Sequence, residues 1–437
     1  MINRNNAVCQ AKDTRPVWRV FMFQLDKNNK NTIKAATKRG FEQSEKAPLG
    51  ILRNLPPPSD KKPLPQWAQN DAQTQRKDRY KVLSAVRQML LVEGLKQFPE
   101  LPTKYHRSTL CKHSLTGSEV AVLLSSEHGK AFFDGLQTCG NVWTCPVCAA
   151  KVQERRRLEI AEAMEHFYQV GNRQAVMVTF TFPHKKLMKL KDLLTKQAEG
   201  FTILRKGKQW DKFKAKNCFE GLIRSLEVTH GKNGWHPHTH ELWFINREID
   251  ELAFTEFVQE KWKRACIKSG LLDENNPKEL KAFEQYAVDI KFNCKASDYL
   301  AKVDHKDNLK SYWGADREIA KASSKGKKEG KGMHPFQLAI DNKQELFIEY
   351  VNAIRGKAQL FWSRGLKSKV GIEEKTDEEL AEEKNDDADI ITMISKPEWL
   401  VIRKKEKRAQ VLNVAENEPK NIRSFILGIV ADNLQNE

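Results

Sequence analysis

Helical and strand-like hydrophobic patterns follow one another along residues 71–370. In "RKDRYKVLSAVRQMLLVEGLKQF", apolar side chains such as Leu83, Val86 and Leu90 recur near the 3.6-residue period, which predicts a helix within 71–104. The stretches "AAKVQERRRLEIAEAMEHFYQV" and "IDELAFTEFVQEKWKRACIKSG" predict two further helices. The run "QAVMVTFTF" is rich in valine, threonine and phenylalanine and predicts a strand. This mixture predicts an α+β fold.

Two strand-like runs, "GLIRSLEVTH" and "GWHPHTHELWFI", flank the turn sequence "GKNG" and predict a β-hairpin. A two-residue turn at Lys232 and Asn233 places Glu227 directly opposite His238. Because alternate residues of a strand point to one face, His240 shares that face with His238. The pattern therefore predicts a carboxylate and two imidazoles side by side on the hairpin.

Such a cluster suits a divalent metal ion. A carboxylate and two imidazoles can hold Mn²⁺ or Mg²⁺ and leave coordination positions open for water and phosphate. His236 lies two residues before His238 and is either a further ligand, a residue that supports the ligands, or a contact to DNA. The alternative interpretation is a polar cluster at the end of a strand.

A second candidate metal site is formed by cysteines between residues 105 and 158. The predicted ligands are Cys111, Cys139, Cys145 and Cys148. The "CPVC" pair has the spacing that presents two thiolates to one tetrahedral Zn²⁺. Cys111 is the fourth ligand by inference, with His113 as the alternative, and a site closed by four protein ligands is structural. The other interpretation is a cluster of buried free thiols. The adjacent "KVQERRR" would lie on a zinc-anchored helix able to meet DNA phosphates.

The charge of the chain indicates its partner. The 437 residues carry a formal net charge of +18, which favours nucleic acid first and an acidic membrane second. No stretch approaches the roughly 20 apolar residues that span a bilayer, and the N-terminus lacks the apolar segment of a signal peptide. We therefore expect no membrane association and a cytoplasmic location.

The stretch "CKASDYLAKVDHK" carries a candidate nucleophile. On a helix, Tyr299 and Lys302 share a face because they are three residues apart. Next to a metal ion that polarises a phosphodiester, a tyrosine can attack phosphorus, and the lysine would neutralise phosphate charge. Tyr286 and Tyr312 are the alternative nucleophiles. Without the histidine hairpin, the same motif would indicate a packed tyrosine beside a surface lysine.

The order of these motifs resembles a known superfamily. "VMVTFTF", then "EVTH" with "GWHPHTHELWFI", then "DYLAKV" resemble the three ordered motifs of the HUH endonucleases, and most closely the replication initiator (Rep) proteins of rolling-circle plasmids. The cysteine pattern, "HPFQLA" and "FWSRGLKSKVG" are similar to that plasmid family as well. Thr239 stands where a bulky hydrophobic residue is usual between the two histidines.

The resemblance implies a central antiparallel sheet of RRM-like type with flanking helices, beside the small zinc-binding segment. It implies nicking and rejoining of one strand at the plasmid origin through a 5′-phosphotyrosine, in the bacterial cytoplasm. Origin DNA, in double-stranded and hairpin or single-stranded form, would be the partner, with a host helicase and polymerase. Some relatives end the cycle with a glutamate four residues before the tyrosine. Here that position is Lys295, which leaves Asp298, Glu318 or Tyr312 as candidates.

The predicted organisation has five parts. They are a flexible basic and proline-rich arm (1–70), a helical segment (71–104), a zinc-binding segment (105–158), the endonuclease domain (159–370), and an acidic linker with a small C-terminal module (371–437). Two other functions remain open. A transposase of the same superfamily would use the same chemistry, whereas a non-catalytic zinc DNA-binding regulator would need neither the tyrosine nor the histidine site.

Overall fold

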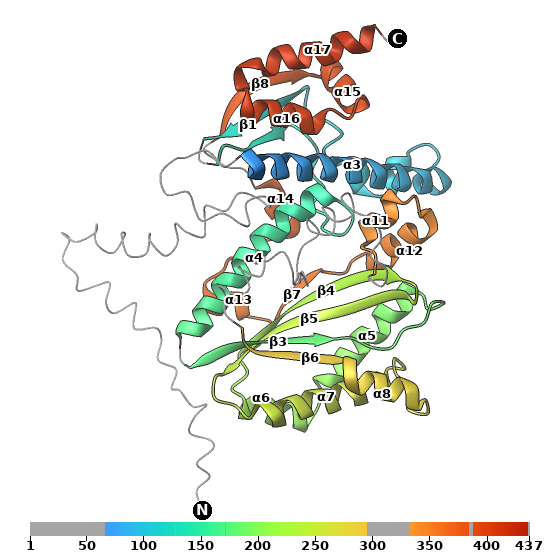
Figure 1. The fold of residues 1–437 in the computed structure, drawn as a ribbon, viewed down its shortest axis with the longest axis vertical. Helices are drawn as coiled ribbons and strands as arrows, with labels where there is room; N and C mark the ends of the chain where they lie inside the picture. Colours follow the sequence, from blue (N-terminus) through green and yellow to red (C-terminus); the bar gives the residue numbers. More distant parts are fainter. Residues whose placement is uncertain (1–65, 127, 171, 295–331, 384–387, 436–437) are drawn as a thin grey trace, which may run out of the picture.

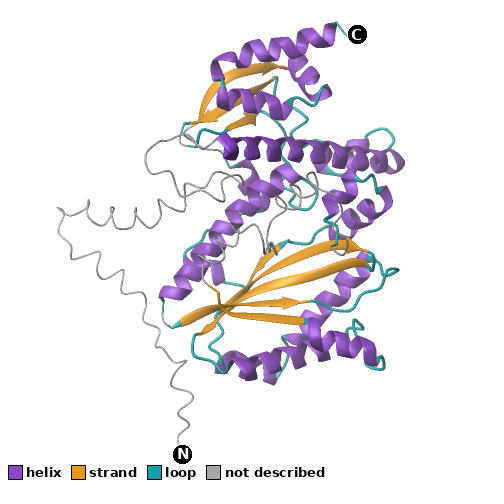
Figure 2. Cartoon of the chain, viewed as in Figure 1, coloured by secondary structure: helices purple, strands orange, loops and turns teal. Residues whose placement is uncertain are grey.

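The computed structural model describes residues 66–126, 128–170, 172–294, 332–383 and 388–435 (Figure 1). The predicted N-terminal arm therefore lies almost entirely outside the described residues. The strands of the described chain gather in two separate sheets with helices between and around them (Figure 2).

The larger sheet has five antiparallel strands, in the order β6-β3-β5-β4-β7. The strands are β3 (Arg173–Phe180), β4 (Gly221–Gly231), β5 (Gly234–Asn246), β6 (Val288–Cys294) and β7 (Leu360–Trp362). β4 and β5 form the predicted hairpin, and the register pairs Glu227 with His238 as the turn sequence predicted. An α+β fold with a central antiparallel sheet and flanking helices is thus confirmed.

One face of this sheet is mainly apolar, and the buried Glu241 on it pairs with Arg205 and Arg224. Helices α5 (Leu190–Leu204), α6 (Lys208–Lys216), α7 (Glu251–Lys268) and α8 (Pro277–Tyr286) lie on this side (Figure 1). Alternate residues of β3 and β5 point toward them, and Phe180, Trp243 and Trp262 are fully buried. The rings of Phe180 and Trp262 have centroids 5.0 Å apart. This aromatic core fixes the position of the hairpin.

The opposite face is divided between an apolar half and a polar half. Helices α4 (Pro146–Gln169) and α13 (Leu366–Val370) pack on the apolar half. Phe167 of α4 stacks on Phe244 of β5 with ring centroids 4.4 Å apart. Toward the start of β5 the side chains on this face become polar, so within the described residues the cover by α4 and α13 ends where the histidines begin. The predicted boundary at 158/159 falls inside α4, so the cysteine segment and the sheet share this helix.

The smaller sheet joins distant parts of the chain. β1 (Glu119–Ser125) lies between β2 (Ala131–Asp134) and β8 (Ala388–Ser395). Helices α15 (Lys396–Lys404), α16 (Arg408–Asn417) and α17 (Ile422–Leu434) complete this unit, and Trp399 is buried against Phe133. The predicted C-terminal module therefore shares a sheet with the cysteine-bearing segment.

The acidic stretch 373–390 belongs to the predicted acidic linker, and the described part of it corrects this expectation. Leu380 and Ala381 of α14 (Asp377–Glu382) are buried, because α14 packs on α4. Residues 388–390 belong to β8, which pairs with β1. The apolar side chains hold the segment in place, and Asp377 and Glu383 pair with arginines of α4.

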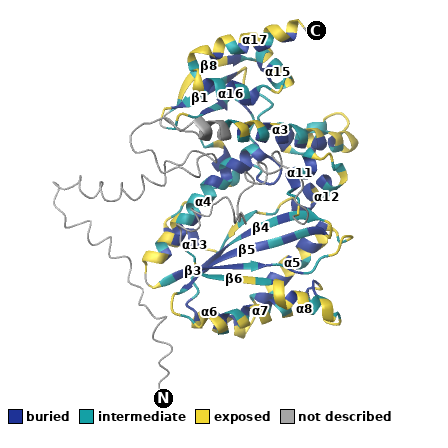
Figure 3. Cartoon of the chain, in the orientation of Figure 1, coloured by how far each residue is buried: buried dark blue, intermediate teal, exposed yellow. Residues whose placement is uncertain are grey.

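The long helix α3 (Gln66–Gln97) connects the two sheets. It contacts α4, α16, α11 (Pro335–Ile340) and α12 (Gln344–Ile354), so one continuous apolar core runs through both units (Figure 3). Short 3₁₀ helices at Pro102–Tyr105, Arg107–Thr109 and Pro419–Asn421 complete the described elements. Within these parts of the chain, no helix has the length and apolar character needed to cross a membrane.

Candidate metal centres

The polar half of the larger sheet holds a cluster of one carboxylate and two imidazoles. Glu227 Oε2 lies 2.8 Å from His238 Nε2 and 3.7 Å from His240 Nε2. All three ligand atoms lie within 4.8 Å of one another. Adjacent ligands of an octahedral ion at roughly 2.1 Å lie about 3.0 Å apart, so these atoms fit around one divalent ion. The three residues predicted from the hairpin are brought together.

The protonation states in this cluster also suit a cation. Burial opposes ionisation of Glu227, but hydrogen bonds from His238 and His240 outweigh it and lower the pKa of the carboxyl to about 2. Burial lowers the pKa of His240 below its ordinary value, against the opposing attraction of Glu227. Near pH 7, Glu227 is therefore ionised and His240 neutral, and metal ligands must be in these forms to bind.

His236 stands beside this cluster. Its Nε2 atom is 2.7 Å from Thr181 Oγ1, and its ring stacks on His184 with centroids 4.6 Å apart and planes 13° apart. Its ring centroid is 5.0 Å from that of His238. In the described structure, the ligand atoms grouped around Glu227 are those of His238 and His240, so His236 forms a wall of the site.

The predicted nucleophile, Tyr299, lies outside the described residues. The same holds for the other candidates near it, which are Lys302, Lys295, Asp298, Tyr312 and Glu318. Cys294, the last described residue before the segment 295–331, pairs with Ala175 of β3. After the segment, Met333 pairs with His230 of β4. The described residues on either side of 295–331 thus both pair with the sheet that carries the histidines. Tyr286, the described alternative, ends α8 and is 66% exposed.

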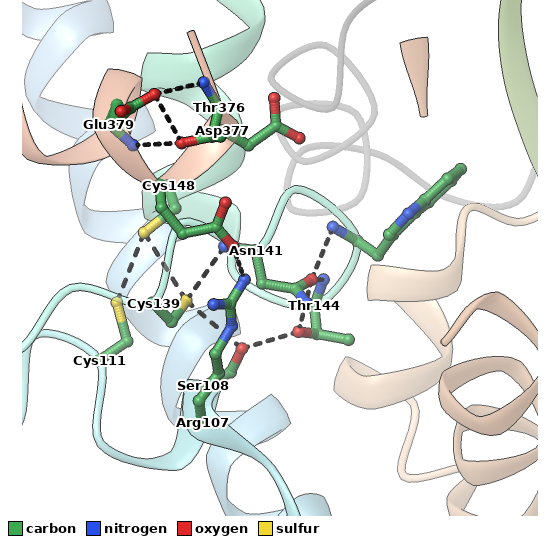
Figure 4. Close-up of polar contacts among 12 residues, drawn as sticks. Arg107, Ser108, Cys111, Cys139, Asn141, Thr144, Cys148, Thr376, Asp377 and Glu379 are labelled. Carbon is green, nitrogen blue, oxygen red and sulfur yellow. Dashed lines mark hydrogen bonds and ion pairs between the residues drawn. The ribbon is translucent and has the colours of Figure 1, made fainter. Parts of the chain in front are cut away.

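The four predicted cysteines form a second, fully buried cluster. Figure 4 shows three of them, Cys111, Cys139 and Cys148. Cys111 Sγ lies 3.5 Å from the Sγ atoms of Cys145 and Cys148, and Cys139 Sγ lies 3.7 Å from that of Cys148. Tetrahedral Zn²⁺ with Zn–S bonds of about 2.3 Å places its sulfurs roughly 3.8 Å apart. The spacing is far longer than an S–S bond and fits four thiolates around one zinc ion.

Local geometry explains how these cysteines converge. Cys145 caps the N-terminus of α4, where its Sγ accepts from the backbone N–H of Cys148. Gly140 adopts a φ of +61°, and a Cβ there would lie 2.7 Å from Cα of Glu378. Only glycine allows this turn to bring Cys139 against α14. The alternative ligand His113 instead hydrogen-bonds Arg403 at 3.1 Å, outside the cluster.

The arginines that follow this site are bound within the protein. Arg155 pairs with Glu383 at 3.1 Å, and Arg157 pairs with Glu154 at 2.6 Å. Arg156 contacts Glu159 and Asp377, each at 3.0 Å, and donates to the carbonyl of Lys375. Contact of "KVQERRR" with DNA phosphates stays a prediction, and these ion pairs count against it, because α4, α14 and Glu383 supply carboxylates to all three guanidinium groups.

The sequence prediction missed the residues that surround the histidines. Thr179 and Thr181 were assigned to a strand and given no role, although Thr179 Oγ1 lies 2.9 Å from His240 Nδ1. Their alternation in "VTFTF" was the available signal, because it places both hydroxyls on one face. His184 and His334 were missed as well. Burial lowers the pKa of His334 to about 4, and Nδ1 of this residue caps α11.

Residues 132–409 match the family described as "Replication protein". "Protein rep" of Streptomyces lividans is 24% identical over 316 aligned residues, which cover 58% of this chain and 68% of the relative. The "Neomycin resistance protein" of Streptomyces cyanogenus is 31% identical over 177 residues, but this match covers only 40% of the relative. No solved structure matches. Because the family match spans more than half of the sequence, the chain belongs to the replication-protein family, as its resemblance to plasmid replication initiators predicted.

Proposed function

We propose that this replication protein initiates rolling-circle replication by nicking and rejoining one strand at a plasmid origin. The observation that carries the proposal is the cluster of Glu227, His238 and His240 on one face of the larger sheet. Mn²⁺ or Mg²⁺ held by these residues would polarise the scissile phosphodiester and stabilise the leaving 3′-oxygen.

Tyr299 is the proposed nucleophile. Its hydroxyl oxygen would form a bond to phosphorus as the bond to the 3′-oxygen breaks, and the proton lost by tyrosine would balance the one gained by the 3′-oxygen. The products are a 5′-phosphotyrosine and a free 3′-OH for a host polymerase. Lys302 would neutralise the phosphate. A separate host helicase is expected, because the sequence has no Walker-type phosphate-binding loop.

The attachment of the chain to the sheet is compatible with this role. Ala175, the partner of Cys294, lies four residues before Thr179 on β3, about 13 Å along a strand. Thr179 in turn pairs with His240. Tyr299 follows Cys294 by five residues, and an extended chain of that length spans up to roughly 17 Å. The length of this segment is therefore compatible with the proposed role of Tyr299.

We also propose that the four cysteines hold a structural Zn²⁺. Four protein ligands leave no open position for a substrate, and the cluster is buried at the start of α4. The other end of α4 packs beside the histidine face through Phe167. The zinc would thus fix a helix that borders the nicking site.

Nicking of supercoiled plasmid DNA tests this function. Wild-type protein with Mn²⁺ should convert a plasmid that carries the cognate origin to the open circle, whereas a plasmid without the origin stays supercoiled. Tyr299→Phe should abolish nicking and keep origin binding, because the phosphate contacts remain. Origin binding without nicking by the wild type would favour a DNA-binding regulator. Cleavage only of single-stranded transposon-like ends would favour a transposase.

A further inference from the structure

Two threonines contact the histidines of the neighbouring strand β5. Thr179 lies in β3, and Thr181 directly follows this strand. Thr179 pairs with His240 across the β3–β5 ladder, and its Oγ1 lies 2.9 Å from His240 Nδ1. Two residues later, Thr181 Oγ1 lies 2.7 Å from His236 Nε2. In His240 the contacted nitrogen is the one opposite Nε2, the atom nearest to Glu227.

The backbone around these hydroxyls is held firmly. Thr179 lies between two paired strands, opposite His240 on β5 and Asp289 on β6. The backbone N–H of Thr181 donates to the carbonyl of Ala287 at 2.9 Å, and its carbonyl accepts from Nε1 of the buried Trp262 at 2.8 Å. The hydroxyls are thus fixed by the sheet and by the aromatic core behind it.

The Thr179 contact bears on the form of the imidazole. A histidine that binds a metal through Nε2 must carry its proton on Nδ1. Without an ion, Nε2 can donate to Glu227 while the threonine hydroxyl donates to Nδ1. When an ion occupies Nε2, Thr179 Oγ1 is placed to accept from His240 Nδ1–H. Outer contacts of this kind fix the tautomer and ring orientation of metal ligands.

We propose that Thr179 is a positioning residue of the metal centre, which holds His240 in the Nδ1–H tautomer with Nε2 directed at the ion. The inference rests on the proposed metal-dependent function. It also gives the "VTFTF" motif a physical role, because the alternation that forms the strand places a hydroxyl behind His240.

His238 differs from His240 in this respect. Its Nε2 contacts Glu227, and its buried Nδ1 has no hydrogen-bond partner within the described residues. The hydroxyl support from β3 is therefore specific to His240 among the two predicted imidazole ligands. Loss of Thr179 should consequently affect one ligand of the centre and leave Glu227 with His238 in place.

Three variants of the full chain test the proposal. Thr179→Val keeps the shape of the side chain and removes the hydroxyl, Thr179→Ser keeps the hydroxyl, and Thr392→Val removes a strand hydroxyl in the other sheet. Mn²⁺ affinity is measured by electron paramagnetic resonance of the free ion. We expect roughly 10–100-fold weaker binding for Thr179→Val and near wild-type binding for the other two. Equal affinity of Thr179→Val and wild type would overturn the proposal, as would equal weakening by Thr179→Ser.

A second readout reports the tautomer in the loaded protein. Long-range ¹H–¹⁵N spectra of histidine-labelled protein with diamagnetic Mg²⁺ report the tautomer of each ring, and His240→Gln assigns the signal. We expect the Nδ1–H tautomer in wild type and a mixture in Thr179→Val. A wild type that bound neither Mn²⁺ nor Mg²⁺ would refute the proposed metal chemistry. An ion-bound wild type with the same tautomer mixture as Thr179→Val would refute the positioning role alone.

Discussion

Replacement of one cluster cysteine should destabilise the protein far more than replacement of a buried cysteine elsewhere. Cys139 and Cys266 are both buried, with exposed fractions of 3% and 0%. Of these two, Cys139 alone has its sulfur within 4 Å of another cysteine sulfur among the described residues. Cys266→Ser is therefore a matched control for Cys139→Ser, because both changes bury a hydroxyl in place of a thiol.

The expected magnitudes separate the zinc site from a cluster of free thiols. A buried hydroxyl without a partner costs about 1–3 kcal/mol, which is the loss expected for Cys266→Ser. Structural zinc contributes on the order of 10 kcal/mol, comparable with the whole stability of a domain. Closure of the 28-residue span between Cys111 and Cys139 alone corresponds to about 3 kcal/mol of chain entropy. Cys139→Ser should therefore yield protein that is largely unfolded or aggregated.

Thermal melting with and without a zinc chelator, together with elemental analysis, measures this difference. The wild type should contain about one tightly held zinc per chain, as a single four-thiolate site requires, and should lose its cooperative transition in chelator. Cys266→Ser should retain both the zinc and the transition. Zinc-free wild type that melts at an unchanged temperature would refute the zinc site, and Cys139→Ser would then resemble Cys266→Ser.

Three further predictions follow from the geometry. Glu227→Gln should weaken Mn²⁺ binding by more than the roughly 10–100-fold that loss of an outer contact costs, with unchanged circular dichroism; calorimetry showing wild-type affinity would contradict this. Burial, helped by nearby arginines, lowers the pKa of His106 to about 4, and burial does the same for His334. Between pH 6.5 and 4 the unfolded chain therefore binds more protons than the folded one. As the pH falls through this range, the free energy of unfolding decreases by at most about 1.36 kcal/mol per pH unit per histidine. His106→Asn should flatten the dependence of the melting temperature on pH, and an unchanged slope would count against this account. Arg156→Ala should cost about 1–3 kcal/mol of stability, because its carboxylate partners on α4 and α14 lose a cation. It should leave the salt dependence of DNA affinity unchanged, and a slope reduced by about one would show a phosphate contact instead.

The hairpin and the cysteine cluster were predictable because their signals are local. A two-residue turn and a period of two fix which residues face Glu227, and the "CPVC" spacing brings two sulfurs together on one helix turn. The β1–β8 pairing was not predictable, because it joins Val122 to Thr392 across most of the chain. No local periodicity records such a partner. For the same reason, the sequence did not predict the ion pair between Arg156 and Asp377, which lie 221 residues apart.

The most direct test of the central claim is to identify the residue and the DNA end joined in a covalent complex. The full chain is incubated with Mn²⁺ and origin DNA, the adduct is digested, and the peptide and the attached strand are sequenced. The account predicts that Tyr299 carries the 5′-phosphate of one origin strand and that the other fragment ends in a free 3′-OH. An adduct on Tyr286 or Tyr312 would contradict the assignment of the nucleophile, and nicked origin DNA without any adduct would contradict the tyrosine mechanism.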